Sequence, residues 1–318
     1  MSDLKNVLLT DPIAAEGEDA LVRAGVQVLR APDSDPATIR SLARNAHGII
    51  IRSKLPDDIF DAAPGVRAVV VHGTGTDLVP LTAATARGVM VANLPGSNAQ
   101  SVAEYCVMAM LMLARNIASV VQTLKAGTWD RARALGAGNH EIAAMTLGIV
   151  GVGEIGKRVA KICGQGFGMR LLGHQRHLER LPAQVEGRDL ASLLTESDFV
   201  VVTCPLTAQT RHMFNRDTLQ RMKPTAWLVN VGRGAVVEER ALIDLLREQR
   251  IAGAMLDVYE HYRLEPGHPL LALDNVILTP HFAGMTGESR ARMGVAAAEE
   301  MLRMLAGERP RNPVHADR

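Results

Sequence analysis

The sequence predicts an α/β protein with two domains, each built on a parallel sheet, with one domain inserted into the other. Short apolar runs alternate with amphipathic stretches from the start of the chain. Such alternation is typical of parallel sheets with helices on both faces. The same rhythm starts again at Thr146–Val150, after a long helical segment. A chain of 318 residues is also longer than a single hydrophobic core usually serves, so we expect two cores.

The first series of elements fills residues 1–97. Each predicted strand is a short apolar run, and the predicted helices between them carry apolar residues on one side. We expect helices at Glu18–Ala24 and Ala37–Ala43, and strands at Val7–Leu9, Val26–Leu29, Gly48–Ile51, Val69–Val71 and Val89–Val91.

A strongly helical segment, Ser101–Arg115, separates the two series, and Asn98 is its expected N-cap. The second series runs to a strand at Val276–Leu278, and another long helix follows at Glu288–Leu305. If this last helix returns to the first sheet, the second series is an insertion. We therefore expect one domain from residues 1–97 with 286–318, and the other from residues 98–285.

The composition excludes several classes of partner. The chain has 35 Lys and Arg against 34 Asp and Glu, so it lacks the basic surplus that nucleic acid or anionic lipid requires. The longest apolar segment, Val102–Ala114, is too short to span a bilayer and contains Glu104. Cys106, Cys163 and Cys204 lie far apart without a CxxC pair. This spacing favours reduced thiols in the cytoplasm over disulfides or a metal site.

A dinucleotide-binding motif begins the second series. The apolar run Thr146–Val150 is followed at once by the glycine motif GVGEIG at Gly151–Gly156, and then by an amphipathic helix. The three glycines permit a tight turn, a close approach of backbone to a pyrophosphate, and tight packing of helix on strand. The amino terminus of the helix offers N–H groups to the phosphates. Glycines alone would also fit a simple strand-to-helix turn, but in this context they predict a Rossmann-like domain that binds a nicotinamide dinucleotide.

The loop after the next strand, Arg170–Gly173, bears on the choice of cofactor. An NAD site usually has Asp or Glu here to accept hydrogen bonds from the ribose 2′-hydroxyl. This chain has Gln175, Arg176 and His177 instead. A carboxylate would repel a 2′-phosphate, whereas these residues would attract it. The loop therefore predicts a preference for NADP(H), with NAD(H) as the alternative if Arg176 is only a solvated loop residue.

Three later segments each place a polar residue after an apolar strand, where open α/β sheets bind ligands. Taken singly, each residue is as well explained by a structural role. Together with a nicotinamide site they make chemical sense, because arginine can hold a carboxylate in two hydrogen bonds and histidine can exchange the hydroxyl proton as hydride moves. They predict an oxidoreductase that acts on carbon 2 of a small 2-hydroxy or 2-keto acid. The segments are Trp227–Gly234 with Arg233, Gly253–Glu260 with Asp257, and Asn275–Gly284 with His281.

With these segments the chain resembles the D-isomer-specific 2-hydroxyacid dehydrogenases over nearly its whole length. The resemblance also includes Ile51-Arg52-Ser53, the loop Gly73–Asp77 and the stretch Ser97–Glu104. It implies that Arg233 binds the substrate carboxylate and that His281 is the acid/base. It further implies a homodimer, and a reductase of glyoxylate-like or hydroxypyruvate-like substrates.

The resemblance also implies which other residues contact the substrate and the cofactor, and it implies no metal site. On the substrate side they are Arg52, Ser53, Gly73, Thr74, Gly75 and Asn98. On the cofactor side they are Gly151, Gly153, Glu154, Ile155, Gly156, Gln175, Arg176, His177, Cys204, Pro205, Val231, Gly232, Asp257 and Gly284.

One position departs from the family pattern. The family has a glutamate five residues after the aspartate that corresponds to Asp257, followed by proline, and this glutamate hydrogen-bonds the catalytic histidine. Here that position is Tyr262, and Glu265-Pro266 lies three residues later. A tyrosine can orient an imidazole but brings no negative charge near neutral pH. We therefore expect the partner of His281 to be Tyr262 or Glu265.

Two functions from different classes are compatible with these residues. The first is a nicotinamide-dependent reductase of 2-keto acids. The second is a dinucleotide-sensing binding protein on the same scaffold, like the corepressors that the family also contains. The presence of both Arg233 and His281 favours the reductase, and the missing glutamate favours the binding protein.

Overall fold

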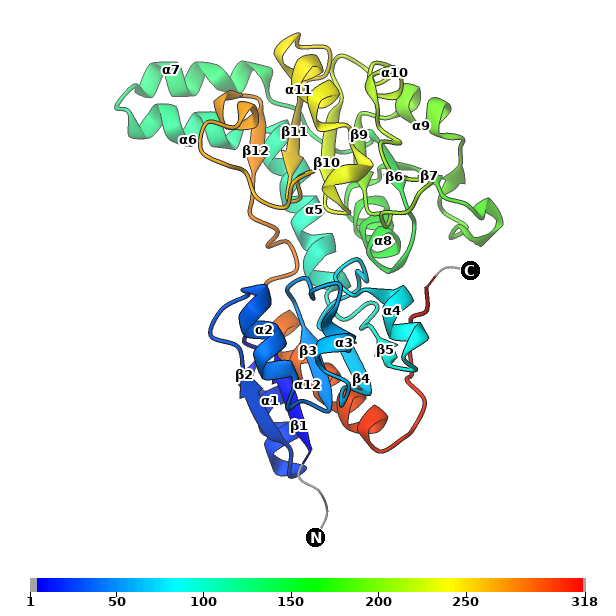
Figure 1. Cartoon of the computed structure of the whole chain (residues 1–318). Coiled ribbons are helices and arrows are strands. Elements are labelled where there is room, and N and C mark those ends of the chain that lie inside the picture. The colour runs from blue at the N-terminus through cyan, green and yellow to red at the C-terminus, as the bar shows by residue number, and fades with distance from the viewer. Residues whose placement is uncertain (1–4, 317–318) are drawn as a thin grey trace. The chain divides into compact units, whose positions relative to one another are not determined.

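The computed structural model describes residues 5–316 and divides into two compact units. The residues up to Asn98 and those from Met285 form unit 1, and Ala99–Gly284 forms unit 2 (Figure 1). Each unit has one parallel sheet with helices on both faces, so the predicted α/β class with parallel sheets is confirmed. The sequence placed the joins at 97/98 and 285/286, and the contacts in the structure place them at 98/99 and 284/285.

Unit 1 contains a five-stranded parallel sheet in the order β2-β1-β3-β4-β5. This is the flavodoxin-like strand order, in which ligands bind beyond the carboxyl ends of the strands. The central strands β3 and β4 are buried at every residue, which explains why they are continuous apolar runs. The strands are β1 Asn6–Leu9, β2 Gln27–Arg30, β3 Gly48–Ile51, β4 Ala68–Val71 and β5 Met90–Ala92.

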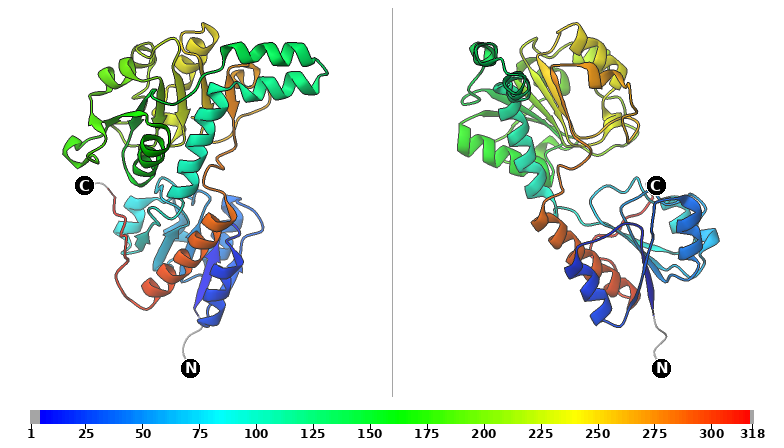
Figure 2. Two further views of the ribbon diagram at one scale, coloured as in Figure 1. Left: turned by 180° about the vertical axis from the view of Figure 1, so that it is seen from behind. Right: turned by 90° about the vertical axis from the view of Figure 1, so that its left-hand side faces the viewer.

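Helices cover both faces of this sheet (Figure 2). On one face, α1 and α12 lie side by side and approach so closely that a Cβ on Gly17 would come within 2.3 Å of the backbone of Gly294. The predicted last helix therefore returns to the first sheet. The helices on that face are α1 Ala15–Arg23 and α12 Gly287–Leu305; on the other face they are α2 Pro36–Ala43, α3 Ile59–Ala62 and α4 Leu81–Ala86.

Unit 2 contains a seven-stranded parallel sheet in the order β12-β11-β10-β9-β6-β7-β8. Six of these strands follow the order of dinucleotide-binding folds, with the motif strand at the centre. The strands are β6 Thr146–Val150, β7 Arg170–His174, β8 Glu186–Gly187, β9 Phe199–Val202, β10 Trp227–Asn230, β11 Gly253–Leu256 and β12 Val276–Leu278.

Two separate cores fill the faces of this second sheet. One face is covered by α5 and α8, and the other by α9, α10 and α11. Between the larger elements lie four short 3-10 turns, η1 Leu135–Gly138, η2 Leu178–Arg180, η3 Gly234–Val236 and η4 Pro269–Ala272. The helices are α5 Ala99–Ala114, α8 Glu154–Phe167, α9 Leu190–Glu196, α10 Arg216–Leu219 and α11 Glu239–Arg247.

A helical hairpin that the sequence pattern did not predict follows α5. Its two helices, α6 Ile117–Lys125 and α7 Trp129–Ala134, extend side by side away from the sheet of unit 2 (Figure 1). None of the residues of α6 is buried. Across residues 5–316 no single helix is long and apolar enough to cross a membrane; α5 and α6 reach that length and apolarity only as a pair, which is bent by 62°.

Asn98 directly precedes α5, at the predicted N-cap position, but its side chain does not cap the helix. The helix begins at Ala99, but Oδ1 of Asn98 is buried and accepts no hydrogen bond from residues 5–316. The first turn is fixed from a different direction, because Oγ of the buried Ser101 donates a hydrogen bond to the carbonyl oxygen of Ala283 at 2.9 Å. A residue distant in sequence thus anchors the start of α5.

A buried histidine closes the carboxyl end of β4 in unit 1. His72 is 5% exposed, and neither ring nitrogen hydrogen-bonds any of residues 5–316. Its pKa is lowered from 6.5 to about 4, chiefly by burial and then by the charges of Arg52 and Arg290, against smaller raising effects of its own backbone and of Asp11. The folded protein therefore holds His72 neutral, whereas the unfolded chain takes up a proton below about pH 6.5.

This difference predicts a stability loss in mild acid. Because the folded-state pKa is the lower one, the effect is absent above pH 6.5, grows as the pH falls towards 4, and levels off below 4. At pH 5 the protein should have lost about 2 kcal/mol of unfolding free energy that His72→Gln retains. Urea denaturation of both proteins at pH 7 and pH 5 measures this, with His315→Gln on the exposed tail as the control. Equal pH dependence of all three would refute it.

Candidate active site

The glycine motif forms a tight turn between β6 and α8. Gly151 has a positive φ of 93°, and a Cβ there would come within 2.6 Å of the backbone of Cys204. A Cβ on Gly156 would come within 2.6 Å of the carbonyl oxygen of Gly151, so this glycine lets the helix pack against the strand. A Cβ on Gly153 would meet no atom within 4 Å. Packing does not require glycine at 153, which leaves room for a ligand to approach the backbone there.

The amino terminus of α8 is open for an anion. Gly153 is its N-cap residue and provides no side chain to cap the first N–H groups. Glu154 and Lys157 form an exposed ion pair at 3.8 Å along the helix surface, and Ile155 is half-buried against the core. The residues present therefore fit a dinucleotide pyrophosphate.

The ends of the neighbouring strands β9 and β10 form one wall beside this turn. Burial raises the pKa of the Cys204 thiol to about 11, so the side chain is a neutral wall and not a nucleophile. Pro205 follows it, and a Cβ on Gly232 would come within 2.7 Å of the carbonyl oxygen of Cys204. Val231, only 9% exposed, completes this wall at the end of β10.

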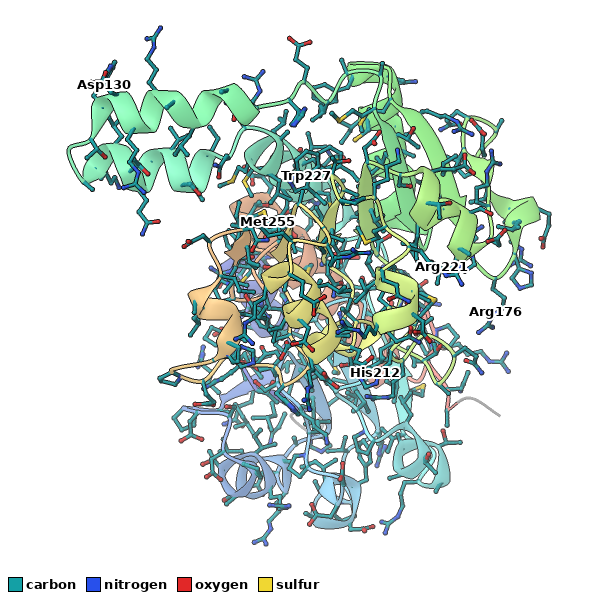
Figure 3. All side chains as sticks on the ribbon, turned by 90° about the horizontal axis from the view of Figure 1, so that it is seen from above. Asp130, Arg176, His212, Arg221, Trp227 and Met255 are labelled. Atoms are coloured by element: carbon teal, nitrogen blue, oxygen red, sulfur yellow. The ribbon has the colours of Figure 1, made fainter. Side chains whose placement is uncertain are left out.

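The loop after β7 exposes two arginines, Arg176 and Arg180, and neither forms an ion pair within residues 5–316. Gln175 donates from Nε2 to the carbonyl oxygen of His177 at 2.8 Å, and His177 pairs with Glu179 at 3.1 Å. Arg176 is exposed, lies at the outer margin of unit 2 in Figure 3, and forms no ion pair within residues 5–316.

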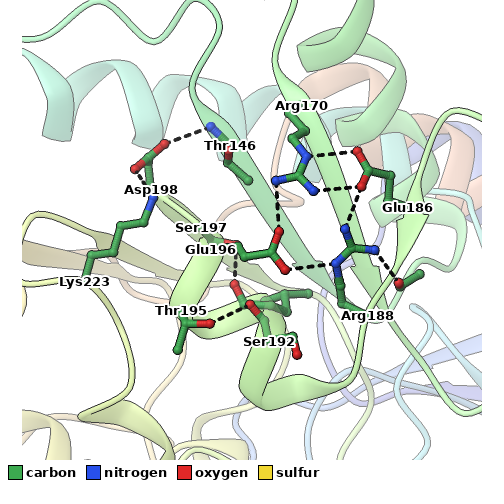
Figure 4. Close-up of polar contacts among 12 residues, drawn as sticks. Thr146, Arg170, Glu186, Arg188, Ser192, Thr195, Glu196, Ser197, Asp198 and Lys223 are labelled. Carbon is green, nitrogen blue, oxygen red and sulfur yellow. Dashed lines mark hydrogen bonds and ion pairs between the residues drawn. The ribbon is translucent and has the colours of Figure 1, made fainter.

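Arg170 and Arg188, on the strand before this loop and after the strand that follows it, are already paired. Arg170 makes two hydrogen bonds to Glu186, and Arg188 joins Glu186 to Glu196 (Figure 4). These ion pairs are partly exposed, so they add little stability, but they fix the short strand β8 beside β7 and α9. Arg176, which directly follows Gln175, is thus the unpaired cation nearest the end of β7 in the sequence.

Arg233 lies in a rigid turn after β10. The buried Asn230 accepts a hydrogen bond from the N–H of Gly232 at 3.1 Å and donates one to the carbonyl oxygen of Arg233 at 3.2 Å. A Cβ on Gly234 would come within 1.9 Å of the backbone of Tyr259, so only glycine lets these two loops pass. The backbone that carries the guanidinium is therefore fixed on both sides.

His281 lies in a turn that is gathered around one carboxylate. Asp257, 1% exposed at the end of β11, accepts hydrogen bonds from Oγ1 of Thr279 at 2.7 Å, from N–H of Phe282 at 2.9 Å and from N–H of Ala283 at 3.0 Å. The N–H of His281 donates to the carbonyl oxygen of Asp257 at 2.9 Å. His281 itself has φ 54°, the left-handed region, and its side chain is exposed. We refer to residues 279–284 as the His281 turn.

The aromatic ring of Tyr262 lies against the imidazole of His281. The ring centroids are 6.0 Å apart and the planes meet at 71°, an edge-to-face contact. The side chain of Glu265 makes no hydrogen bond or ion pair to another residue in the described part of the chain. Both residues line a cavity of about 360 Å³ in the loop that follows β11.

Two histidines and two glutamates fix the base of this loop. Glu239 and Glu260 each accept a hydrogen bond from the other's backbone N–H. His212 hydrogen-bonds Glu260 at 2.7 Å, and His268 contacts Glu239 at 3.1 Å (His212 is labelled in Figure 3). No group of three His, Cys, Asp or Glu residues that could hold a metal ion occurs within residues 5–316.

Of the predicted substrate-side residues in unit 1, Arg52 and Ser53 follow β3, and Gly73, Thr74 and Gly75 follow the neighbouring strand β4. Oγ of Ser53 donates to the carboxylate of Asp11 at 2.8 Å, and the N–H of Arg52 donates to Oγ1 of Thr10 at 3.1 Å. Asn93 donates to the carbonyl oxygen of Thr74 at 2.7 Å, which holds the loop that also contains Gly73 and Gly75. Asn98 closes unit 1 where the chain leaves it.

Sequence reasoning missed several residues that shape these loops. Asp11 follows β1 at the same sheet edge as Arg52, so the rule that located the other residues could have found it. No sequence signal marks Ser101 or Tyr105, because their partners lie more than 170 positions away.

Comparison with known proteins places the chain among nicotinamide-dependent dehydrogenases. Residues 107–283 match the family model described as the NAD binding domain of D-isomer specific 2-hydroxyacid dehydrogenases. The glyoxylate reductase of Aeropyrum pernix is 39% identical over 292 residues, 88% of this chain and 86% of that protein.

Solved structures agree with the sequence match. An NADPH-dependent glyoxylate/hydroxypyruvate reductase of Sinorhizobium meliloti, in complex with NADP and malonate, is 29% identical with a TM-score of 0.86 over 98% of this chain and 96% of that one. An NAD-dependent formate dehydrogenase of Staphylococcus aureus, in complex with NAD, is 26% identical with a TM-score of 0.88 over 99% and 100% of the chains. The resemblance identified from the motifs is confirmed: the chain belongs to the D-isomer specific 2-hydroxyacid dehydrogenase family.

Proposed function

We propose that the protein reduces a small 2-keto acid of the glyoxylate and hydroxypyruvate type to the 2-hydroxy acid, with NADPH as the preferred cofactor. The observation that carries this proposal is the geometry of one sheet edge. Arg233 and His281 follow β10 and β12, and the open glycine turn follows β6, so all three lie at the carboxyl edge of the same parallel sheet. The names of the relatives support the substrate class.

The cofactor would be held by the residues that form this edge. When bound, a reduced nicotinamide supplies the hydride that reduces carbon 2. The turn Gly151–Gly156 would hold the pyrophosphate at the start of α8. The walls of the site would be the ribose loop with Gln175, Arg176 and His177, the strand ends with Cys204, Pro205, Val231 and Gly232, and Gly284. Asp257 was expected here too, but its carboxylate is used by the His281 turn, which supports a positioning role instead.

Arg233 would then bind the substrate carboxylate, and His281 would transfer the proton. The guanidinium would hold the substrate carboxylate in two hydrogen bonds and draw electron density from the adjacent carbonyl. As the new C–H bond forms, the carbonyl electron pair moves to oxygen, and protonated His281 gives that oxygen its proton. The exposed imidazole can be reprotonated from solvent. In unit 1, Arg52, Ser53, Gly73, Thr74, Gly75 and Asn98 are the residues that we propose to contact the rest of the substrate.

The alternative, a corepressor-like binding protein, is not favoured. A binding protein needs no proton donor, yet Asp257 and Thr279 hold the turn that presents His281. The reductases among the relatives support an enzyme.

The reaction is tested by NADPH oxidation, followed at 340 nm, with glyoxylate, hydroxypyruvate and pyruvate. His281→Asn should lower kcat by about 100-fold or more while NADPH still binds, because proton transfer in the transition state typically contributes that much. Arg233→Lys keeps the charge but loses the planar fork, so kcat/KM should also fall. His315→Asn, on the exposed tail, should match the wild type. Near-normal turnover of His281→Asn would contradict the proposed acid, and near-normal turnover of Arg233→Lys would show that the carboxylate is held elsewhere.

The preference for NADPH rests on the ribose loop. Arg176 is the unpaired cation beside Gln175, and no carboxylate occupies the first position after β7. Glu179 pairs with His177 at the far end of the loop. NADH remains a possible second cofactor, since relatives that bind NAD share the fold.

Arg176→Ala should reduce kcat/KM for NADPH by about 5- to 100-fold and leave that for NADH nearly unchanged, because one charge-assisted hydrogen bond to the 2′-phosphate is lost. Steady-state kinetics with both cofactors measures the effect. Arg180→Ala, a few residues on in the same exposed turn, is the matched control. Equal losses with NADPH and NADH would exclude a role in reading the phosphate.

We propose that Tyr262, and not Glu265, is the neighbour that tunes His281. The ring contact at 6.0 Å supports Tyr262, and the side chain of Glu265 makes no bond to His281. Tyr262→Glu should raise the pKa of His281, because a carboxylate stabilises the imidazolium, and reductive activity should extend to higher pH. Glu265→Gln should leave the pH profile of kcat/KM unchanged. A shift of the Glu265→Gln profile to lower pH would identify Glu265 as the partner instead.

We also propose that the protein is a cytoplasmic homodimer. Ile117, Val121 and Leu124 are 40–44% exposed and repeat at the spacing of one helical face on α6. An apolar stripe on a projecting hairpin favours a second copy as its partner, and the molar mass in solution tests this.

The three buried, unpaired cysteines support a reducing compartment.

A further inference from the structure

Two side chains of α5 hold the His281 turn at its two ends. Ser101 donates from Oγ to the carbonyl oxygen of Ala283 at 2.9 Å. Tyr105 lies one helical turn later on the same face, and its hydroxyl hydrogen-bonds Oγ1 of Thr279 at 2.6 Å. His281 lies between the two anchored residues. Both α5 side chains are buried, at 5% and 6% exposure, so solvent does not compete for these bonds.

In the hydrogen bond between Tyr105 and Thr279, the tyrosine hydroxyl is the donor. Thr279 has a single hydroxyl proton, and it donates that proton to the carboxylate of Asp257 at 2.7 Å. Oγ1 of Thr279 must therefore accept from Tyr105. Burial raises the pKa of Tyr105 above its ordinary value of 10, so its O–H remains a donor at any working pH. The tyrosine ring also packs edge-on against Phe282, with centroids 5.8 Å apart.

The His281 turn needs this support because its own strand is weak. β12 has three residues, lies at the edge of the sheet and is only partly buried. His281 adopts a left-handed backbone conformation, which costs a non-glycine residue about 1–2 kcal/mol. Strain of this kind persists only when the surroundings hold the backbone in place. Asp257 holds the turn from the sheet, and Ser101 and Tyr105 hold it from the helix.

We propose that Ser101 and Tyr105 are positioning residues for the acid/base His281. They touch neither substrate nor cofactor; they fix the orientation of the imidazole through Ala283 and through the chain Tyr105–Thr279–Asp257. The inference rests on the proposed reductase function for its kinetic consequence, but the placement of the imidazole can be observed without turnover.

The kinetic test removes single hydroxyl groups. Tyr105→Phe keeps the ring on Phe282 and Ser101→Ala keeps the helix, and each should lower kcat about 10-fold with the Kd for NADPH unchanged. The unfolding midpoint should fall no more than it does in Ser197→Ala, which also loses a buried hydroxyl. Thr279→Val should cost as much, Thr279→Ser should restore activity, and Tyr105→Phe with Thr279→Val should be no worse than either alone. Ser197→Ala is the matched control, because it removes a buried hydroxyl that donates to the carbonyl of Leu193, on α9.

The second readout is the NMR signal of His281 in protein with 13C-labelled histidine, assigned by its absence from His281→Asn. Tyr105→Phe and Ser101→Ala should shift or broaden this signal, and Ser197→Ala should not. If the wild type is inactive with these substrates, the proposed function is refuted. The NMR signal of His281 then still tests whether Ser101 and Tyr105 fix the imidazole. Wild-type kcat and an unmoved signal in both variants would overturn the inference. The inference would also be overturned if the loss of kcat in these variants were proportional to their loss of stability or of NADPH affinity, because that would indicate a merely structural role.

Discussion

The carboxylate of Asp257 accepts three hydrogen bonds from the turn that carries His281, and the geometry of the site depends on it. Asp257 is almost fully buried, and a buried charge is tolerated only where donors surround it. The donors here come from residues 279, 282 and 283, so the carboxylate and the turn require each other. This mutual requirement lets an edge strand of three residues end in a defined backbone conformation. The hydrogen bonds to Asp257, and not the short strand β12, therefore determine how rigid the site is.

Close backbone packing supplies the second constraint. Gly151, Gly232 and Gly234 each lie where a Cβ would overlap a neighbouring loop, at the ends of β6 and β10. These glycines bring the strand ends of one sheet edge together with little side-chain bulk. A ligand at this edge would contact mostly backbone, and positively charged side chains such as Arg176 and Arg233 would contact it at a few positions. Gly153 differs, because the protein leaves space around it. That space is what a pyrophosphate against the start of α8 would use.

Much of this could be predicted from the sequence because its signals are local. β3, β6 and β12 begin and end where their apolar runs do. The glycine motif, Arg233 and His281 each follow an apolar strand directly, so the rule for parallel sheets located them without a structure. The α6–α7 hairpin was missed although Ile117, Val121 and Leu124 repeat at helical spacing; this apolar face packs on neither core of unit 2. Asn98 was expected to cap α5 on local grounds, yet the first turn of α5 is anchored by Ser101 to Ala283.

The sequence by itself determined the α/β class, the family and the identity of the chemical groups, because each depends on residue type and short spacing. Tertiary structure decided which groups support which. Ser101 and Tyr105 reach residues 283 and 279 only because α5 packs on the same face of the sheet as those residues. The sequence left Tyr262 and Glu265 equally open as neighbours of His281, since both lie in one loop. The fold of that loop brings the ring of Tyr262 to the imidazole, because reciprocal bonds between Glu239 and Glu260 set where the loop begins. Spacing along a chain cannot encode such a choice, because it depends on contacts between residues that the sequence keeps far apart.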